Sequence, residues 1–311
     1  MAGAERDRSE EQRPCPIEEV DQAVDESSDV DGDFAALQKM LSQKRRAAKD
    51  SPESRLQRAL PFVTTFSPNI RPLTISDLGS CIALENAAFP NPEHRASPEK
   101  IAYRLTVCPE LSLGVFITVV PEQAKNLGIE TLSTARPVET GRVDGAVSVL
   151  LAHIISTRCR GNLITDADMA YPKDWRTRGG RSADDVGHQE AGRTVGIHSL
   201  AVLPRLHRCG IGQMIMKAYL DQMKSSGLVD RVALICQDHL VSYYQRCGFT
   251  WKGESVAQFG GGGWHDMVIR NLDVNKSMAL TGVETAEGSA KKEEEEDNDD
   301  DEWNEWDMVD D

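Results

Sequence analysis

The sequence lacks several patterns that would assign it to a common class of protein. Its cysteines form no Cys-x-x-Cys pair and no cysteine–histidine spacing typical of zinc ligands, so we expect reduced thiols, no disulfides and no metal. No apolar run reaches the roughly 20 residues that a membrane-spanning helix requires. Residues 1–12 are charged and lack the apolar stretch of a secretory signal. We therefore expect a cytoplasmic protein that binds neither membrane nor nucleic acid.

Acidic residues are concentrated at both ends of the chain. Residues 1–33 hold 12 acidic and 3 basic side chains and residues 291–311 hold 13 and 2, which gives net charges of −9 and −11. Subtracting both from the total of −15 leaves +5 in the middle, a sign that suits an anionic cofactor. Both ends are too polar to repay the entropy of ordering, so we expect disorder over 1–60 and 273–311. Apolar residues in the acidic C-terminal tail leave room for a motif that binds a protein partner: Trp303, Trp306, Met308 and Val309.

Residues 194–226 predict a strand, a glycine-containing turn and a helix in succession. The apolar, β-branched run 195–203 predicts a strand that ends at Pro204. Helix N-termini expose backbone N–H groups, and the glycines in this turn let an anion approach them, so the turn predicts an anion site. It is neither a Walker loop, since no Gly-Lys-Ser/Thr follows, nor a complete Rossmann fingerprint. Apolar residues then recur at helical spacing before Gly227: Ile211, Met214, Ile215, Ala218, Tyr219 and Met223.

The flanking sequence predicts one α/β domain over residues 65–272, with a polar insertion at 157–191. A short amphipathic helix is expected at 34–48, with Ser51-Pro52 after it as a breaker. We expect further strands at 70–74, 113–120, 143–156, 231–236, 250–255 and 264–269, and further helices at 77–88, 97–108 and 238–247.

Several motifs in this order resemble the GNAT superfamily of N-acetyltransferases. The turn at 207–213 is similar to its (Gln/Arg)-x-x-Gly-x-(Gly/Ala) signature, which holds the pyrophosphate of acetyl-CoA, although His207 stands where glutamine or arginine is usual. Three further stretches resemble the arylalkylamine (serotonin-type) branch of that superfamily: 105–114 (LTVCPELSLG), 197–202 (IHSLAV), and 233–238 with 243–246 (ALICQD and YYQR). The insertion resembles the fungal type of that branch, whose members acetylate polyamines as well as aromatic amines. The resemblance implies a GNAT acyl-CoA N-acyltransferase fold, a mixed central sheet flanked by helices.

The resemblance also implies roles for individual residues. Amine acetylation needs a deprotonated amine, a polarised thioester carbonyl and a proton for the departing CoA thiolate. His198 is the expected general base and Tyr244 the expected general acid. The vertebrate enzymes place two histidines on this strand, but Gly196 occupies the first position here, and His188 in the insertion is a candidate substitute. The expected acetyl-CoA contacts are Leu200, Ala201, Val202, His207, Arg208, Cys209, Gly210, Ile211, Gly212 and Gln213.

The expected reaction transfers an acetyl group from acetyl-CoA to the primary amine of a small arylalkylamine or polyamine. An aromatic ring would lie in an apolar slot, whereas a glutamate would bind the second ammonium of a polyamine. Two alternatives stay open: acetylation of a protein or peptide, and a CoA-binding scaffold without turnover. The residues expected in the slot are Phe89, Pro109, Leu200 and Phe259, and the candidate glutamates are Glu85, Glu93 and Glu110.

Overall fold

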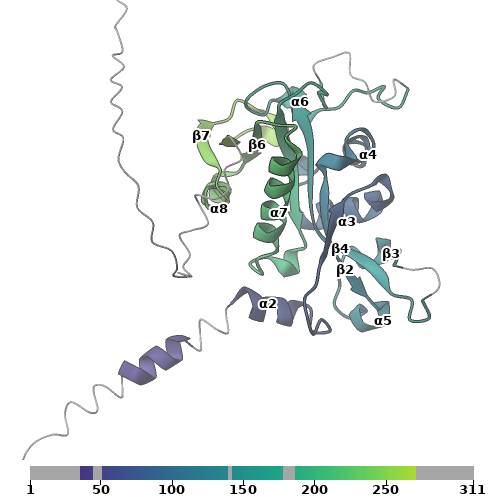
Figure 1. The fold of residues 1–311 in the computed structure, drawn as a ribbon, viewed down its shortest axis with the longest axis vertical. Helices are drawn as coiled ribbons and strands as arrows, with labels where there is room; N and C mark the ends of the chain where they lie inside the picture. The colour runs from purple at the N-terminus through teal and green to yellow at the C-terminus, as the bar shows by residue number, and fades with distance from the viewer. Residues whose placement is uncertain (1–35, 45–50, 139–141, 178–185, 271–311) are drawn as a thin grey trace, which may run out of the picture.

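The structure, a computed structural model, centres on one eight-stranded sheet (Figure 1). It describes residues 36–44, 51–138, 142–177 and 186–270. The strand order is β1-β2-β4-β5-β6-β8-β7, with β3 paired to β4. Within the described residues β5 and β6 form the parallel pair, and the other neighbours are antiparallel. The strands are β1 (Asn69–Pro72), β2 (Leu113–Val119), β3 (Arg136–Pro137), β4 (Val147–Cys159), β5 (Thr194–Val202), β6 (Arg231–Cys236), β7 (Thr250–Glu254) and β8 (His265–Arg270).

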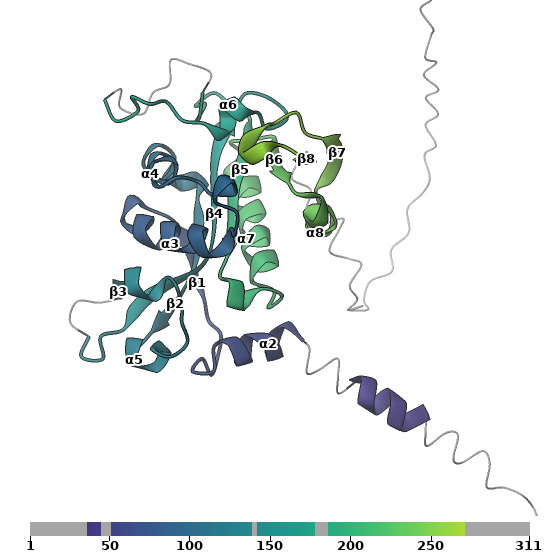
Figure 2. The same ribbon diagram turned by 180° about the vertical axis from the view of Figure 1, so that it is seen from behind.

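Helices cover both faces of this sheet (Figures 1 and 2). Helix α7 lies along one face, and α3 and α4 lie along the other. The predicted mixed sheet flanked by helices is therefore confirmed. The helices are α2 (Pro52–Ala59), α3 (Leu78–Ala88), α4 (Pro98–Val107), α5 (Pro121–Ala124), α6 (Asp166–Met169), α7 (Ile211–Ser226) and α8 (Val241–Arg246). The 3₁₀ turns are η1 (Ile75–Asp77), η2 (Pro92–His94), η3 (Pro109–Leu111), η4 (Leu132–Thr134), η5 (Pro204–Leu206), η6 (Asp238–Leu240) and η7 (Phe259–Gly261).

Serine–proline pairs begin two of these helices. Ser97 caps α4 by accepting a hydrogen bond from the N–H of Lys100 at 3.2 Å, as predicted. Ser51 caps α2 in the same way, so the pair expected to act as a breaker after the helix at 34–48 also begins a helix that the sequence did not predict. Leu60, directly after α2, is fully buried. Residues 52–60 are therefore folded, although they fall in the range 1–60 that was expected to be disordered.

Other parts of the chain also differ from the prediction or lie outside the described residues. Residues 36–44 are helical and exposed, within the predicted helix at 34–48. Strand β4 starts four residues later than predicted and extends to Cys159, so the first residues of the supposed insertion belong to the sheet. The C-terminal tail with its partner motif lies outside the described residues, as does most of the acidic N-terminal region. No helix in the described ranges has both the length and the apolar character needed to cross a membrane.

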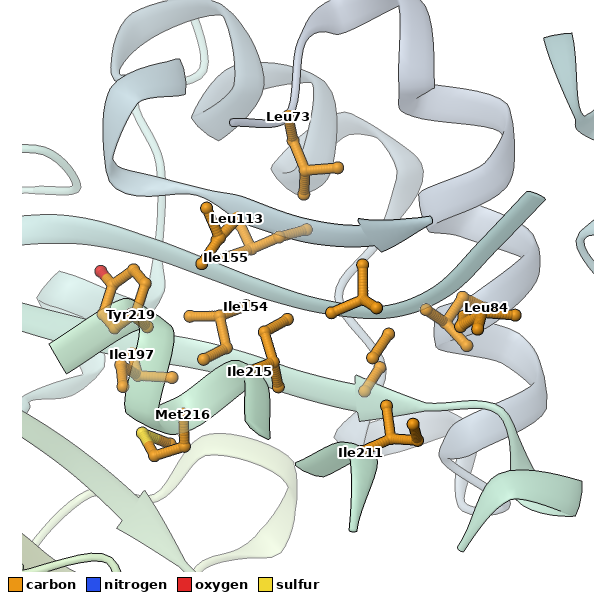
Figure 3. Close-up of a cluster of buried hydrophobic side chains, with 14 of the residues drawn as sticks. Leu73, Leu84, Leu113, Ile154, Ile155, Ile197, Ile211, Ile215, Met216 and Tyr219 are labelled. Carbon is orange, nitrogen blue, oxygen red and sulfur yellow. The ribbon is translucent and has the colours of Figure 1, made fainter. Parts of the chain in front are cut away.

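The core lies between α7 and the sheet. Four residues of the α7 face predicted from helical spacing are buried, whereas the other two, Met214 and Ala218, are half-buried. The four are Ile211, Ile215, Tyr219 and Met223, of which Ile215 and Tyr219 are fully enclosed. Figure 3 shows Ile215 beside Ile154 of β4, and Met216 close to Ile197 of β5. Each fully buried side chain of this kind contributes roughly 1.5–3 kcal/mol of hydrophobic free energy. This packing fixes the strand–turn–helix unit against the rest of the domain. Six cysteines in the described ranges are buried free thiols: Cys81, Cys108, Cys159, Cys209, Cys236 and Cys247.

Candidate active site

The parallel strands β5 and β6 separate halfway along their length. Their pairing runs from Thr194 opposite Arg231 to Ile197 opposite Leu234 and ends there, although β5 continues to Val202. Beyond that point, β5 pairs only with β4 among the described strands. The other edge of 198–202 is therefore free of a strand partner. Ligands of open α/β sheets bind at the carboxyl ends of parallel strands, and an extended ligand can pair with a free edge as an added strand.

His198 is the extra residue of a β-bulge at the start of this free edge. Ile155 of β4 pairs with Ser199, and the next residue, Ser156, pairs with Ile197. One step along β4 thus matches two steps along β5, and His198 has no opposite residue. A bulge bends its strand and changes the direction of a side chain, which is why bulges are frequent beside active sites.

Both ring nitrogens of His198 have a partner. Nε2 lies 2.7 Å from Oγ1 of Thr157 on β4, and Nδ1 lies 3.1 Å from Sδ of Met169 on α6. A thioether can only accept, so this geometry assigns the proton to Nδ1, and Nε2 accepts from the Thr157 hydroxyl. Burial lowers the pKa of His198 well below 6.5, and the nearby Arg104 guanidinium lowers it further. His198 is therefore neutral at pH 7 and able to accept a proton.

The insertion covers the first half of β5 and explains the missing histidine. A Cβ atom added at Gly196 would lie 2.6 Å from Cδ1 of Ile164 and 2.9 Å from Sγ of Cys159. A second histidine therefore does not fit there unless Ile164 moves. His188, the candidate substitute, accepts a hydrogen bond at Nδ1 from the N–H of Arg158, and burial lowers its pKa to about 4. This contact ties His188 to the sheet.

Positive charge lies behind His198 on helix α4. Arg104 is 1% exposed, and its Nη2 donates to the carbonyl of Met169 at 3.1 Å. Its Nε is buried without a hydrogen-bond partner in the described part of the chain, and burial lowers its pKa to about 10. One turn earlier, Nζ of Lys100 lies 4.7 Å from the centre of the Phe259 ring. This end of the site thus carries two cationic side chains.

Glu85 lies in a buried hydrogen-bond network and is 2% exposed. Its carboxylate accepts from Oγ of Ser199 at 2.7 Å and from the N–H of Ala96 at 2.8 Å, and Nε2 of His153 lies 3.3 Å away. Burial alone would raise the pKa of Glu85, but these hydrogen bonds lower it overall. The hypothesis that Glu85 binds a second ammonium of a polyamine stays a prediction, and these contacts already engage its carboxylate within the protein. The carboxylate joins α3 to β4, β5 and the loop before α4.

Tyr244, the expected acid, lies on α8 among other aromatic rings. Its ring centre is 5.1 Å from that of Tyr243 and 5.7 Å from that of Phe249. Burial raises the pKa of Tyr244, so the phenol stays protonated at neutral pH. The neighbouring Tyr243 hydroxyl reaches α7 and would lie 2.9 Å from a Cβ atom placed on Gly212. Gly212 therefore allows α8 to approach the start of α7 closely.

The turn before α7 has the geometry of an anion site. Arg208 and Gly210 both adopt the left-handed backbone conformation, with φ of 63° and 80°. Such alternation turns successive N–H groups toward one point. Helices α2 and α4 each have a serine cap, but no side chain caps α7, which begins after Gly210. The first N–H groups and the positive end of a 16-residue helix thus remain available to an anion. The predicted cradle at 207–213 consists of the turn at 207–210 and the first residues of α7, and η5 joins it to the free edge of β5.

Two loops predicted to flank the amine contact each other. A Cβ atom at Gly260 of η7 would lie 2.8 Å from Cδ2 of His94 in η2. The His94 ring meets the Trp264 ring edge-on, with centres 5.0 Å apart, and Phe259 lies 6.3 Å from Trp264. These rings form an aromatic cluster, defined by His94, Phe259 and Trp264, at the acceptor end. Phe89 ends α3 just before η2, and its carbonyl accepts from Nε of Arg95 at 2.6 Å.

Pro109 lies apart from this aromatic cluster. It begins η3, whose Leu111 carbonyl accepts a hydrogen bond from the Tyr219 hydroxyl of α7 at 3.0 Å. Gln222 of α7 donates to the neighbouring Glu110 carbonyl at 3.1 Å. These contacts tie Pro109 to the α7 face of the sheet, whereas Leu200 lies on β5 itself.

Some residues of the site carried little sequence signal. Thr157 and Met169 contact His198 but fall in a stretch without periodicity. His94 and Trp264 had a weak signal, because His94 lies in a proline-rich loop and Trp264 follows a run of glycines at the start of the strand predicted over 264–269. Within the described residues, no group of three or more His, Cys, Asp or Glu side chains could hold a metal ion.

Comparison with known proteins assigns the class. Residues 172–249, which include β5, the cradle, α7 and α8, match the sequence model of the Acetyltransferase (GNAT) family. Residues 172–249 therefore carry the sequence pattern of a GNAT acetyltransferase. Serotonin N-acetyltransferase of Mesocricetus auratus is 27% identical over 199 residues, which cover 63% of this chain and 74% of that enzyme. The Macaca mulatta enzyme is 34% identical over 73 residues, 24% of this chain and only 36% of its own length.

Solved structures show weaker overall similarity. The ribosomal-protein-S18-alanine N-acetyltransferase of Escherichia coli is 13% identical with a TM-score of 0.37, covering 70% of this chain and 100% of that chain. The PaiA N-acetyltransferase of Thermoplasma acidophilum, solved in complex with coenzyme A, is 14% identical with a TM-score of 0.38, covering 66% and 99%. At these scores the fold assignment rests on the strand order and the family match.

Proposed function

We propose that this protein transfers the acetyl group of acetyl-CoA to the primary amine of a small arylalkylamine or polyamine. The observation that carries the proposal is the free edge of β5 at 198–202, which is joined through η5 and a left-handed turn to the uncapped start of α7. Support comes from the GNAT family match and from the relatives named serotonin N-acetyltransferase.

The residues present fit a coenzyme A thioester. The backbone of Leu200, Ala201 and Val202 offers N–H and C=O groups to the amides of a pantetheine arm. The turn at 207–213 offers main-chain N–H groups to a pyrophosphate, and its left-handed Gly210 keeps side-chain atoms away from that position. When bound, acetyl-CoA supplies the thioester that a neutral amine attacks.

His198 is proposed as the base and Tyr244 as the acid. Neutral His198 accepts the proton of the substrate ammonium at Nε2, the nitrogen that now accepts from Thr157. Thr157 acts as a positioning residue, because its hydroxyl holds the direction of the ring, whereas Met169 fixes the tautomer. Tyr244 stays protonated at neutral pH, so it can donate its phenolic hydrogen to a departing thiolate. Separate residues therefore serve the two proton transfers.

The acceptor end favours an aromatic amine over a polyamine. The aromatic cluster offers ring faces and edges for an aryl group. Lys100 and Arg104 place positive charge beside the same end, and a second ammonium would be repelled there. We therefore propose arylalkylamines as the preferred acceptors and polyamines as the poorer ones.

A thiol-release assay with acetyl-CoA tests the proposal. The full-length protein is given tryptamine, phenylethylamine, spermidine or a peptide panel, with an amine-free reaction as control. Turnover is expected with the two arylalkylamines, and more slowly with spermidine. Turnover with peptides alone would favour the protein acetyltransferase alternative. Binding of CoA in calorimetry without release of thiol from any acceptor would favour the scaffold.

A further inference from the structure

Helix α2 lies beside the cradle, although it precedes the sheet and the domain predicted from sequence. Figure 1 shows α2 next to the end of α7 where that helix begins, and α2 contacts η5. A Cβ atom on Gly210 would lie 3.7 Å from Cβ of Pro52. Between α2 and the turn lies an open pocket of about 340 Å³. It is lined by Arg55, Arg58, Ala59, Arg205, His207 and Cys209, and we call it the α2 pocket.

The α2 pocket is basic. Four of its six lining residues are arginine or histidine, and none of the six is acidic. Two of the basic residues come from the segment between β5 and α7 and are held by hydrogen bonds: His207 Nε2 donates to the carbonyl of Val202 at 3.1 Å, and Arg205 donates through Nη1 to the carbonyl of Leu127. Nε of Arg205 is buried without a partner in the described residues. The other two, Arg55 and Arg58, come from α2, and their side chains border the same opening.

Arginine-rich pockets of this kind suit a phosphate monoester. A guanidinium presents a planar fork of donors that matches phosphate oxygens, and its charge is always present. The cradle offers mainly uncharged N–H groups, so the two neighbouring sites differ in chemistry. His207 and Cys209 belong to both the cradle and the α2 pocket. One ligand can therefore place a pyrophosphate on the turn and a second phosphate group among the arginines.

We propose that the α2 pocket binds the 3′-phosphate of the coenzyme A nucleotide. The inference rests on the proposed function, because it takes acetyl-CoA as the ligand of the cradle. It adds α2 to the cofactor site and makes Arg55 and Arg58 determinants of selectivity for coenzyme A over forms that lack this phosphate. The functional domain then begins at α2 rather than at residue 65.

The test compares CoA with dephospho-CoA, which lacks only the 3′-phosphate. Calorimetry on the full chain gives both dissociation constants for the wild type, for Arg55→Gln/Arg58→Gln and for Arg270→Gln, an exposed arginine at the end of β8. The wild type is expected to bind CoA about tenfold more tightly than dephospho-CoA. This ratio corresponds to the lower end of the free energy that charge-assisted hydrogen bonds contribute, because the pocket is open to solvent. The double variant should lose this preference by binding CoA about tenfold more weakly, with dephospho-CoA unchanged. Arg270→Gln should keep it.

Other results would overturn the inference. Equal affinity of the wild type for CoA and dephospho-CoA would contradict the inference and leave the proposed function standing. A double variant that keeps the preference for CoA would have the same meaning. Inorganic phosphate is titrated separately: phosphate binding that the double variant abolishes, together with equal affinity for the two nucleotides, would assign the pocket to a free anion. The single variants Arg55→Gln and Arg58→Gln should each lose part of the preference. Failure of both nucleotides to bind would instead contradict the proposed function.

Discussion

The proposed cofactor side and acceptor side of the candidate active site are built from different chemical groups, backbone on one side and side chains on the other. The proposed cofactor side consists mainly of backbone: the free edge of β5, a left-handed turn and the uncapped start of α7. The acceptor side consists of side chains from α4, α6 and η7, which meet around His198. Backbone sites depend on glycine and strand order, whereas side-chain sites depend on how distant segments pack. Substitutions on the cofactor side should therefore lower the affinity for the ligand, whereas substitutions on the acceptor side should lower stability and reaction rate.

The largest effect is expected at Glu85 of α3, in the buried side-chain network that supports β5. Glu85→Ala removes a buried carboxylate and leaves Ser199, Ala96 and His153 without their acceptor, which should lower the free energy of unfolding by about 4 kcal/mol at pH 7. Folding lowers the pKa of Glu85, so the ionised carboxylate contributes fully to the free energy of unfolding above its usual pKa of 4.5. This contribution is lost as the pH falls through the lower pKa of the folded protein. Urea unfolding of wild type and variant against pH measures this difference. Glu93→Ala, at an exposed position, is the control. A difference that persists unchanged in acid would contradict the role of the charge.

On the cofactor side, Gly210→Glu should weaken CoA binding about 100-fold, equivalent to about 2.7 kcal/mol. The carboxylate would bring negative charge to the anion site, and the left-handed φ of 80° adds strain. Gly227→Glu is the matched control, because Gly227 ends α7 with φ of 61° and has no neighbour within 4 Å. Calorimetry with CoA should show the loss at position 210 and near-normal affinity at 227. Equal losses in the two variants would trace the effect to backbone strain and contradict the cradle.

A smaller effect should follow from restoring the second histidine. Gly196→His is expected to lower the free energy of unfolding by about 2 kcal/mol, because the new side chain would collide with Ile164 and Cys159. Ile164→Ala makes room, so the double variant should be more stable than the sum of the two single effects by about 1 kcal/mol. Thermal or urea unfolding of the four proteins completes this cycle. Simple additivity would show that Ile164 is not what excludes the histidine.

The same difference between backbone and side chains governs what the sequence could predict. The strand, turn and helix over 194–226 were predictable because periodicity and glycine positions are local signals. The bulge at His198 was not, because it exists only relative to the register of β4. Contacts of Thr157, Met169 and Ile164 with β5 depend on the fold of an aperiodic insertion.

Serine–proline pairs show the limit of local signals most plainly. Ser97-Pro98 and Ser51-Pro52 have the same chemistry and both begin helices, yet only the first had an apolar pattern after it strong enough to predict one. Burial of Leu60 against the core, a tertiary contact, keeps the chain ordered after α2. The start of β4 was likewise misplaced because Val143 is apolar but fully exposed, in a turn before the strand.

The most direct test of the proposed chemistry is kcat/KM for the preferred amine against pH in the wild type, His198→Gln and Tyr244→Phe. Because the pKa of His198 lies well below 6.5, the wild type should keep its base neutral into mildly acidic solution. His198→Gln should be slowed about tenfold or more, most at low pH, and partly rescued as rising pH supplies free amine. Tyr244→Phe should be slowed without that rescue, and affinity for acetyl-CoA should change little in either variant. Superimposable profiles for the three proteins would contradict both assignments and return the two residues to core packing.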